Sequence, residues 1–517
     1  MGLLFLLFNE LSFSNNRWTL HPDDHDLLVF SKVLLKTGHL WYETPYNEKY
    51  RTGAFQPSLN NFQSDRSDRY AVRAAYSPGI YIISSPGHLF GLRGPFFIVS
   101  MLGLTCILFL YLFVKEIFGR AEAVVSAVFL GLSAPYIYWS NMLFTNIPAL
   151  AFLTGGLFFL AKTVSNPGKR TYYFLTVVLF VFSVWMRYEY VLLVFVIALV
   201  ALIAYRRRFK GKLVLQSAVV LLAIVAIILA ANYITSGSVT GTYGAMGAGK
   251  QSAGDLLNYI PELPGPRVLL TNAKMYVFGV APILVLLGIV GIVLALKQNR
   301  NGFTFILVSI SVLVLFLYGK SAGFWGYDKN WLASSYTRYF LPLFMCLSIL
   351  AGACTVRFRE WIPWRRIATA MAVAILLVHM ITSLFVLYDN QFGIEFTDLY
   401  CGNRRSVDIF VSSLPPSAVI VDLSSDNYFR FDIISRVVLN PSYFGKRRAE
   451  QRLARILEDL GNEGIPTYII NNPERSMLNL KHFTDRYDYI VFKTMKHSAV
   501  FQYGSKTPDI YQVEVLR

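Results

Sequence analysis

The sequence predicts a polytopic α-helical membrane protein with about ten or eleven membrane-spanning helices and a soluble α/β domain at its C-terminus. Of its 517 residues, 55% are hydrophobic and only 15% are charged, whereas soluble proteins carry about 25% charged residues. The apolar residues form many runs of roughly 20, the length that a helix needs to cross a bilayer. The net charge of +17 lies in short clusters between these runs, a pattern that orients membrane proteins and argues against a nucleic-acid partner.

Seven apolar runs are the clearest candidate spans. They are 96–114, 123–161, 213–235, 276–296, 303–318, 339–356 and 367–388. The second run is long enough for two helices, and we expect the break near Ser140 and Asn141. The short apolar segment Met1–Phe8 is interpreted as the end of a first transmembrane helix, with a signal-peptide remnant as the alternative.

Another apolar stretch, residues 172–205, is interrupted by Arg187 and Glu189. It is too long for one spanning helix and slightly short for two. If it forms two helices, all five strongly basic connections fall on one side of the membrane, which the positive-inside rule assigns to the cytoplasm. These connections are 115–122, 162–171, 206–212, 297–301 and 357–366. We therefore predict a helical hairpin with its turn at Arg187–Glu189.

This orientation places the long polar segments outside the cytoplasm. They are the first outer loop at 9–95, the loops 236–275 and 319–338, and the tail after Asp389. We predict a multi-pass protein of the cell membrane, with a membrane domain at 1–388 and an extracytoplasmic α/β domain at 389–517. In that tail, 418–423, 467–470 and 489–492 are β-rich, and 447–460 has leucine and isoleucine at helical spacing. Alternating strands and helices predict a small, largely parallel sheet.

The densest polar cluster of the first outer loop is His21–Asp26. Pro22 followed by two acidic residues is typical of a helix start, where carboxylates meet the positive end of the helix dipole. One interpretation is therefore a solvated helix cap. The other is a general base, or a metal site with Asp24 and His25 as ligands, because paired carboxylates can take different protonation states.

Several short motifs follow one another along the membrane domain. The pair Asp23-Asp24 comes just after the first hydrophobic segment, and Tyr76–Tyr81 (Tyr-Ser-Pro-Gly-Ile-Tyr) precedes the next span. Later motifs are Ala134–Tyr136, Thr145–Ala149 and Arg338–Pro342. In this order, over about residues 1–390, the chain resembles the GT-C glycosyltransferases, particularly the protein O-mannosyltransferases and the bacterial aminoarabinose transferases that act on lipid A.

This resemblance implies transfer of a sugar from a polyprenyl-phosphate donor to a lipid, glycan or protein acceptor at the outer face of the membrane. Asp23 or Asp24 would be the general base, and the anomeric centre would be inverted. Asn146 stands where many relatives have an acid. Because its amide is uncharged, the resemblance implies no certain cofactor and leaves a divalent metal ion open.

Basic residues at the ends of the predicted spans are candidates for holding the donor phosphate. Arg187 suits this role because guanidinium groups form bidentate contacts with phosphate oxygens. The alternative interpretation is a salt bridge with Glu189 at an exposed turn, or a side chain that extends into the lipid headgroups. Arg338 and Tyr339, with Lys329 in the preceding aromatic loop, form a second candidate group. His25, Tyr76, Asn146 and Glu189 complete the candidate site.

Two other functions compete with sugar transfer. A polytopic transporter or lipid flippase without catalysis should carry charged residues or broken helices near the bilayer midplane. A polymerase or ligase of envelope polysaccharides would have a similar topology. The charges of this chain cluster at the ends of the spans, which favours chemistry at the membrane surface.

Overall fold

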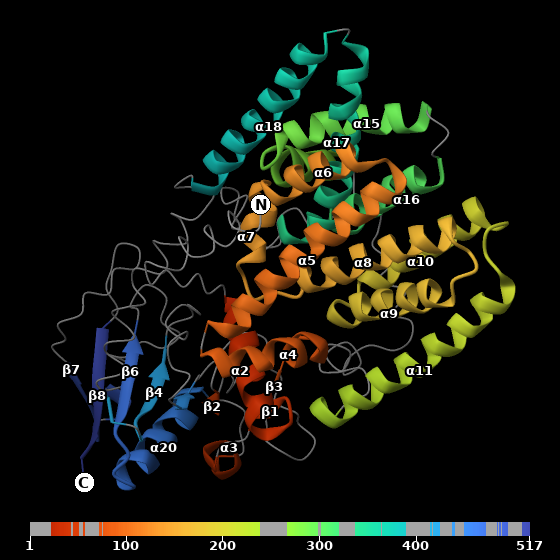
Figure 1. Cartoon of the computed structure of the whole chain (residues 1–517). Coiled ribbons are helices and arrows are strands. Elements are labelled where there is room, and N and C mark those ends of the chain that lie inside the picture. The colour runs from red at the N-terminus through yellow and green to blue at the C-terminus, as the bar shows by residue number, and fades with distance from the viewer. Residues whose placement is uncertain are drawn as a thin grey trace. The chain divides into compact units, whose positions relative to one another are not determined.

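Figure 1 shows a computed structural model of the chain. The structure describes residues 22–42, 45–50, 55–56, 72–74, 76–91, 93–237, 266–297, 301–319, 337–362, 364–388, 414–415, 417–423, 437–439, 449–471, 483, 485–487, 489–494 and 509–516. The segment Met1–Phe8 and Lys329 lie outside these ranges. The chain divides into two compact units. The membrane unit comprises 1–16, 77–233 and 247–397, and the sheet unit comprises 17–76, 234–246 and 398–517.

The membrane unit is built from helices that follow one another through short connections. They are α4 (Pro78–Ser84), η1 (Ser85–Phe90), α5 (Gly94–Ile117), α6 (Arg120–Gly131), α7 (Ala134–Ser140), α8 (Asn146–Ser165), α9 (Arg170–Met186), α10 (Tyr190–Tyr205), α11 (Gly211–Ser236), α14 (Pro266–Asn272), η2 (Ala273–Phe278), α15 (Pro282–Lys297), α16 (Asn301–Gly319), η3 (Thr337–Phe340), α17 (Leu341–Trp361) and α18 (Arg365–Tyr388). Most of α8 and α17 is buried, whereas α11 and α18 are largely exposed. The apolar side chains that α11 and α18 expose are suited to contact with lipid.

Five helices of the described chain are long and apolar enough to cross a membrane: α5, α8, α11, η3 with α17, and α18. Two bent pairs, α6 with α7 and α14–η2 with α15, raise this number to seven. The shorter apolar helices α9, α10 and α16 coincide with further runs that the sequence identifies as spans. The predicted fold class, a polytopic helical membrane protein with a small α/β region, is confirmed.

Two features of the helical hairpins agree with the sequence. Residues 172–205 form α9 and α10, separated by a turn at Arg187–Glu189, and the run 123–161 is broken between Ser140 and Asn146. The bends within α6–α7 and α14–α15, of 65° and 112°, were not predicted. The second bend falls inside the run 276–296, which we expected to be one helix. There Gly279 follows a π-helical turn and Pro282, which lacks a backbone N–H donor, starts α15.

The sheet unit contains a six-stranded sheet in the order β2-β5-β4-β6-β8-β7. Its strands are β2 (Phe55–Gln56), β4 (Val419–Asp422), β5 (Val437–Leu439), β6 (Thr467–Asn471), β7 (Ile490–Thr494) and β8 (Asp509–Val515), and α20 (Ala449–Asn462) packs against it. The strands and the helix predicted in the tail are present, but the expectation of a largely parallel sheet was wrong. Only β5-β4-β6 is parallel, and the remaining pairs are antiparallel.

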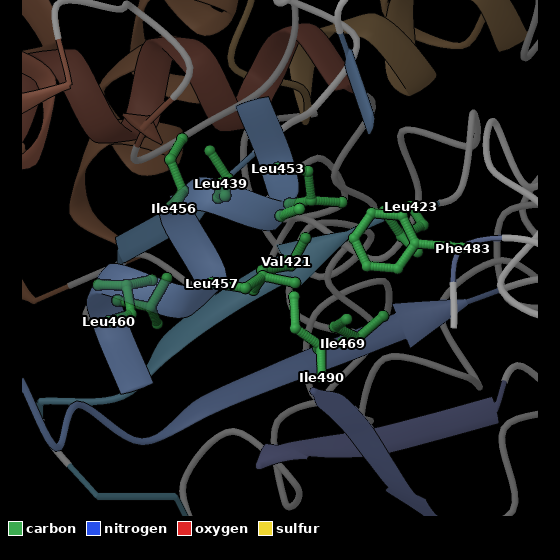
Figure 2. Close-up of a cluster of buried hydrophobic side chains, with 12 residues drawn as sticks. Val421, Leu423, Leu439, Leu453, Ile456, Leu457, Leu460, Ile469, Phe483 and Ile490 are labelled. Carbon is green, nitrogen blue, oxygen red and sulfur yellow. The ribbon is translucent and has the colours of Figure 1, made fainter. Parts of the chain in front are cut away.

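The core of this unit lies between α20 and the sheet (Figure 2). Leu453, Leu457 and Leu460 recur at helical spacing along α20, so they share one face and pack against Val421 and Ile469 of the strands. All five of these side chains are at most 1% exposed. Burial of this apolar face, rather than intrinsic helix propensity, is what stabilises a helix of this length.

The first outer loop also contributes to the sheet unit. Its strand β2 pairs antiparallel with β5, so that Phe55 is opposite Leu439. Lys49, at the end of α3 (Pro45–Lys49), forms an ion pair with Glu463. The same loop holds α2 (Pro22–Thr37) and the two-stranded ribbon of β1 (Trp41–Tyr42) and β3 (Val72–Arg73). A two-residue strand in a polar segment carries no sequence pattern that predicts its partner.

Candidate functional site

Arg187 occupies the turn between α9 and α10. Its backbone is extended, at φ −151° and ψ 104°, and its carbonyl accepts a hydrogen bond from the N–H of Tyr190, which starts α10. The turn is held from one side by α4, because Ser77 Oγ donates a hydrogen bond to the carbonyl of Trp185. Gly79 permits this close approach, since a Cβ there would lie 2.5 Å from Met186 Cε.

The Arg187 guanidinium is buried although it is charged, with only 7% of the residue exposed. Its Nη2 lies 3.3 Å from Glu189 Oε1, and the Glu189 side chain is 40% exposed. Its Cζ lies 4.5 Å from the centroid of the Tyr339 ring. Burial alone would lower the pKa of Arg187, but the Glu189 carboxylate and nearby tyrosine hydroxyls raise that pKa well above its ordinary value. Arg187 is therefore a permanent cation.

Arg338 is a second buried cation, 5% exposed, in the short helix η3 that leads into α17. Its Cζ lies 4.0 Å from the centroid of the Phe144 ring and 5.3 Å from that of Tyr339. Its backbone carbonyl accepts a hydrogen bond of 3.0 Å from Asn146 Nδ2. The α7–α8 connection therefore holds Arg338 through both the aromatic ring of Phe144 and the amide of Asn146.

We call Arg187, Glu189, Arg338, Tyr339 and Phe144 the arginine cluster. Both guanidinium groups face the ring of Tyr339, and the carboxylate of Glu189 pairs with Arg187. Guanidinium groups form charge-assisted hydrogen bonds with phosphate oxygens, often two at a time. The cluster is therefore suited to a phosphate monoester or diester, an anion that accepts hydrogen bonds from guanidinium groups.

Aromatic stacking fixes the position of η3. Tyr318, near the end of α16, stacks on Tyr339 with ring centroids 4.9 Å apart. Tyr276, in the π-helical turn η2, stacks on Phe340 at 6.4 Å. Helix α16 and the π-helical turn η2 thus pack on Tyr339 and Phe340 of η3.

Comparison with known proteins identifies the architecture. Residues 81–230 match the family model described as dolichyl-phosphate-mannose-protein mannosyltransferase. The structure of ArnT from Cupriavidus metallidurans bound to undecaprenyl phosphate aligns with a TM-score of 0.61 at 13% identity, covering 99% of this chain and 96% of that one. The apo structure of the same ArnT aligns with a TM-score of 0.57 at 11% identity, covering 98% and 97%. The oligosaccharyltransferase of Archaeoglobus fulgidus aligns with a TM-score of 0.55 at 12% identity, covering 98% and 74%.

The chain has the GT-C fold. The fold that the sequence motifs imply through their resemblance to the GT-C glycosyltransferases is thereby confirmed. The matched residues of the family model include α9, Arg187 and α10. A search among curated proteins found no match.

Five of the candidate residues that the sequence identifies lie together. Arg187, Glu189, Arg338 and Tyr339 belong to the arginine cluster, and Asn146 is hydrogen-bonded to it. Their functional roles stay predictions.

The remaining candidates are Asp23, Asp24, His25, Tyr76 and Lys329. Asp23, Asp24 and His25 occupy the first turn of α2, which begins at Pro22 as its sequence pattern predicts. The structure describes the backbone of these three residues but not their side chains. Tyr76 is half-buried, directly before Ser77 and α4. Lys329 is not among the described residues. A divalent metal with Asp24 and His25 as ligands stays a prediction.

Sequence reasoning missed several residues of the site. Phe144 and Trp139, whose rings lie 4.0 and 5.8 Å from the Arg338 Cζ, are hidden in the apolar run 123–161. Tyr318 stacks on Tyr339. Outside the arginine cluster, in the sheet unit, Asp26 of α2 is fully buried, and burial cannot be read from a polar sequence.

Proposed function

We propose that this GT-C chain is a glycosyltransferase that moves a sugar from a polyprenyl-phosphate donor to an acceptor at the outer face of the cell membrane. The observation that carries the proposal is the arginine cluster, in which two buried guanidinium groups share one aromatic ring and one carboxylate. A phosphate placed there would accept charge-assisted hydrogen bonds from guanidinium groups. The ArnT relative, crystallised with undecaprenyl phosphate, supports a lipid-linked phosphate as the ligand.

In the proposed reaction the acceptor hydroxyl oxygen attacks the anomeric carbon of the donor sugar. Asp23 or Asp24 takes the hydroxyl proton as general base, and the bond between the anomeric carbon and the phosphate oxygen breaks. Polyprenyl phosphate leaves with the electron pair of that bond, and the sugar is transferred with inversion. Arg187 and Arg338 would stabilise the negative charge that grows on the leaving phosphate.

The side of the membrane is proposed from the basic connections, and the acceptor class is proposed from the comparisons. The basic connections favour a cytoplasmic location for the ends opposite the arginine cluster, so that the cluster and the α/β domain would be extracytoplasmic. The family model describes protein mannosyltransferases, and the A. fulgidus oligosaccharyltransferase was crystallised with a tethered acceptor peptide. We therefore favour a protein acceptor over a lipid or glycan.

One observation favours the transporter or flippase alternative. Two of the helix pairs are bent by 65° and 112°, and broken helices are typical of the substrate sites of transporters. Such a protein would move the polyprenyl-phosphate sugar across the bilayer with its glycosidic bond intact.

The two functions are separated by following both halves of the donor. The purified protein is reconstituted in vesicles with a radiolabelled undecaprenyl-phosphate hexose and an extract of envelope proteins. Transfer releases free undecaprenyl phosphate and labels the acceptor, and Arg187→Ala should abolish both signals. Arg170→Ala is a matched control, because Arg170 starts α9 and is exposed, whereas Arg187 follows its end. Movement of label between leaflets without release of undecaprenyl phosphate would refute the proposal.

A further inference from the structure

Three buried polar atoms beside the arginine cluster make no hydrogen bond to any residue that the structure describes. They are Nε1 of Trp139, Oδ1 of Asn146 and Oη of Tyr190. None of the three residues is more than 1% exposed. Native proteins leave few buried polar side chains unsatisfied, and each such group calls for an explanation.

Each of the three residues contacts Arg187 or Arg338. The Trp139 ring lies 5.2 Å from that of Phe144 and 5.8 Å from Arg338 Cζ. Asn146 uses its Nδ2 to bind the Arg338 carbonyl, which leaves Oδ1 as its unsatisfied atom. Tyr190 starts α10 directly after Glu189, and its N–H is hydrogen-bonded to the Arg187 carbonyl.

A phosphate cannot satisfy all three atoms. The indole N–H of Trp139 only donates, the amide oxygen of Asn146 only accepts, and the phenol of Tyr190 does both. An ionised phosphate accepts hydrogen bonds but has none to offer Asn146 Oδ1. A sugar hydroxyl both donates and accepts, and the apolar face of a sugar ring can pack on the neighbouring aromatic rings of Trp139 and Phe144.

We propose that Trp139, Asn146 and Tyr190 form the subsite for the donor's sugar, and that this subsite selects an uncharged, hydroxyl-rich sugar over an aminosugar. The proposal rests on the proposed function, since the arginine cluster must first hold the donor phosphate. The three groups are uncharged, and the carboxylate of Glu189 is already engaged with Arg187. The ammonium group of an aminosugar would therefore lie near two guanidinium groups, and like charges repel.

Substitutions that remove the unsatisfied polar atoms test the subsite. Tyr190→Phe removes the unsatisfied hydroxyl and keeps the ring, so it should raise the melting temperature of the ligand-free protein. The same variant should weaken binding of undecaprenyl-phosphate mannose about fivefold, the loss expected for one hydrogen bond, and leave binding of undecaprenyl phosphate unchanged. Trp139→Phe should likewise weaken only the mannosylated lipid.

The matched control is Tyr136→Phe. The Tyr136 hydroxyl is satisfied, because it donates a 2.6 Å hydrogen bond to the Gly103 carbonyl. Its removal should therefore lower the melting temperature and leave both affinities unchanged, the reverse of the result for Tyr190→Phe.

Different results overturn the subsite and the proposed function. Equal loss of affinity for the bare and the mannosylated lipid in Tyr190→Phe and Trp139→Phe, or no loss for either lipid, would overturn the subsite alone. Equal affinity of the native protein for undecaprenyl-phosphate mannose and for an undecaprenyl-phosphate aminohexose would overturn its selectivity, where we expect at least a tenfold preference. Failure of the native protein to bind undecaprenyl phosphate at all would overturn the proposed function.

Discussion

Replacement of Arg338 is the most direct test of the arginine cluster. The Cζ atoms of Arg187 and Arg338 lie 4.5 and 5.3 Å from the same ring centroid, so they are at most about 10 Å apart. At an effective dielectric constant of about 20, two like charges at that distance repel by at least roughly 1.7 kcal/mol. Removing one of them relieves this repulsion in the ligand-free protein and offsets the loss of packing on Phe144. We therefore expect Arg338→Ala to unfold within a few degrees of the native protein.

Binding of the donor should respond in the opposite way. Two charge-assisted hydrogen bonds to phosphate contribute about 3 kcal/mol, so Arg338→Ala should raise the Kd for undecaprenyl phosphate roughly 100-fold. Arg338→Lys keeps the charge but loses the second hydrogen bond and the planar contact with Phe144, and we expect about a tenfold increase. Titration in lipid nanodiscs, with the melting temperature measured on the same samples, gives both quantities. Equal affinity in all three forms, or unfolding of the ligand-free Arg338→Ala variant, would refute the role of Arg338.

Three further predictions concern the catalytic acids and the scaffold. Asp23→Asn or Asp24→Asn should abolish transfer of labelled sugar with the melting temperature unchanged, because a carboxamide cannot take a proton at neutral pH; full activity in both variants would exclude them as the base. Leu457→Ala should lower the free energy of unfolding of the sheet unit by about 2–5 kcal/mol and speed its proteolysis. Gln451→Ala on the exposed face of α20 should do neither. Equal rates of proteolysis of the two variants would contradict the packing in Figure 2. Gly79→Val should weaken donor binding at least fivefold by displacing the Arg187 turn, and native affinity would show that α4 does not position that turn.

The parts of the fold that the sequence predicts are those in which one physical effect dominates. Charges are costly within a bilayer, so Arg187 and Glu189 mark the turn between α9 and α10. Leu453, Leu457 and Leu460 likewise predict α20, because their spacing leaves one apolar face to bury. The bend between α6 and α7 and the π-helical turn before α15 lie within uninterrupted apolar runs, where hydropathy gives no signal. Strand β2 pairs with a segment nearly 400 residues away, and no local pattern encodes that contact.

The candidate site shows the same division. Arg187 and Arg338 are predictable because a charged side chain at the edge of an apolar run is costly and is therefore often functional. Trp139 and Tyr190 are not, because an aromatic residue at the end of a span is ordinary in a membrane protein. What distinguishes them is an unsatisfied polar atom, and that is a property of the packed structure alone.

The bent helices, which would suit a transporter, also deliver side chains to the arginine cluster. The α6–α7 bend leads toward Phe144 and Asn146, which contact Arg338. The turn at η2 places Tyr276 on Phe340, which follows Tyr339 of the cluster. Each bend therefore positions side chains at or beside a charged site at the ends of the spans. In a transporter, by contrast, the bent helices would have to open and close around the substrate. If the bends only hold a preorganised site, a disulfide that locks α7 to α17 should preserve sugar transfer. Loss of transfer in the oxidised protein and its recovery on reduction would instead favour alternating access.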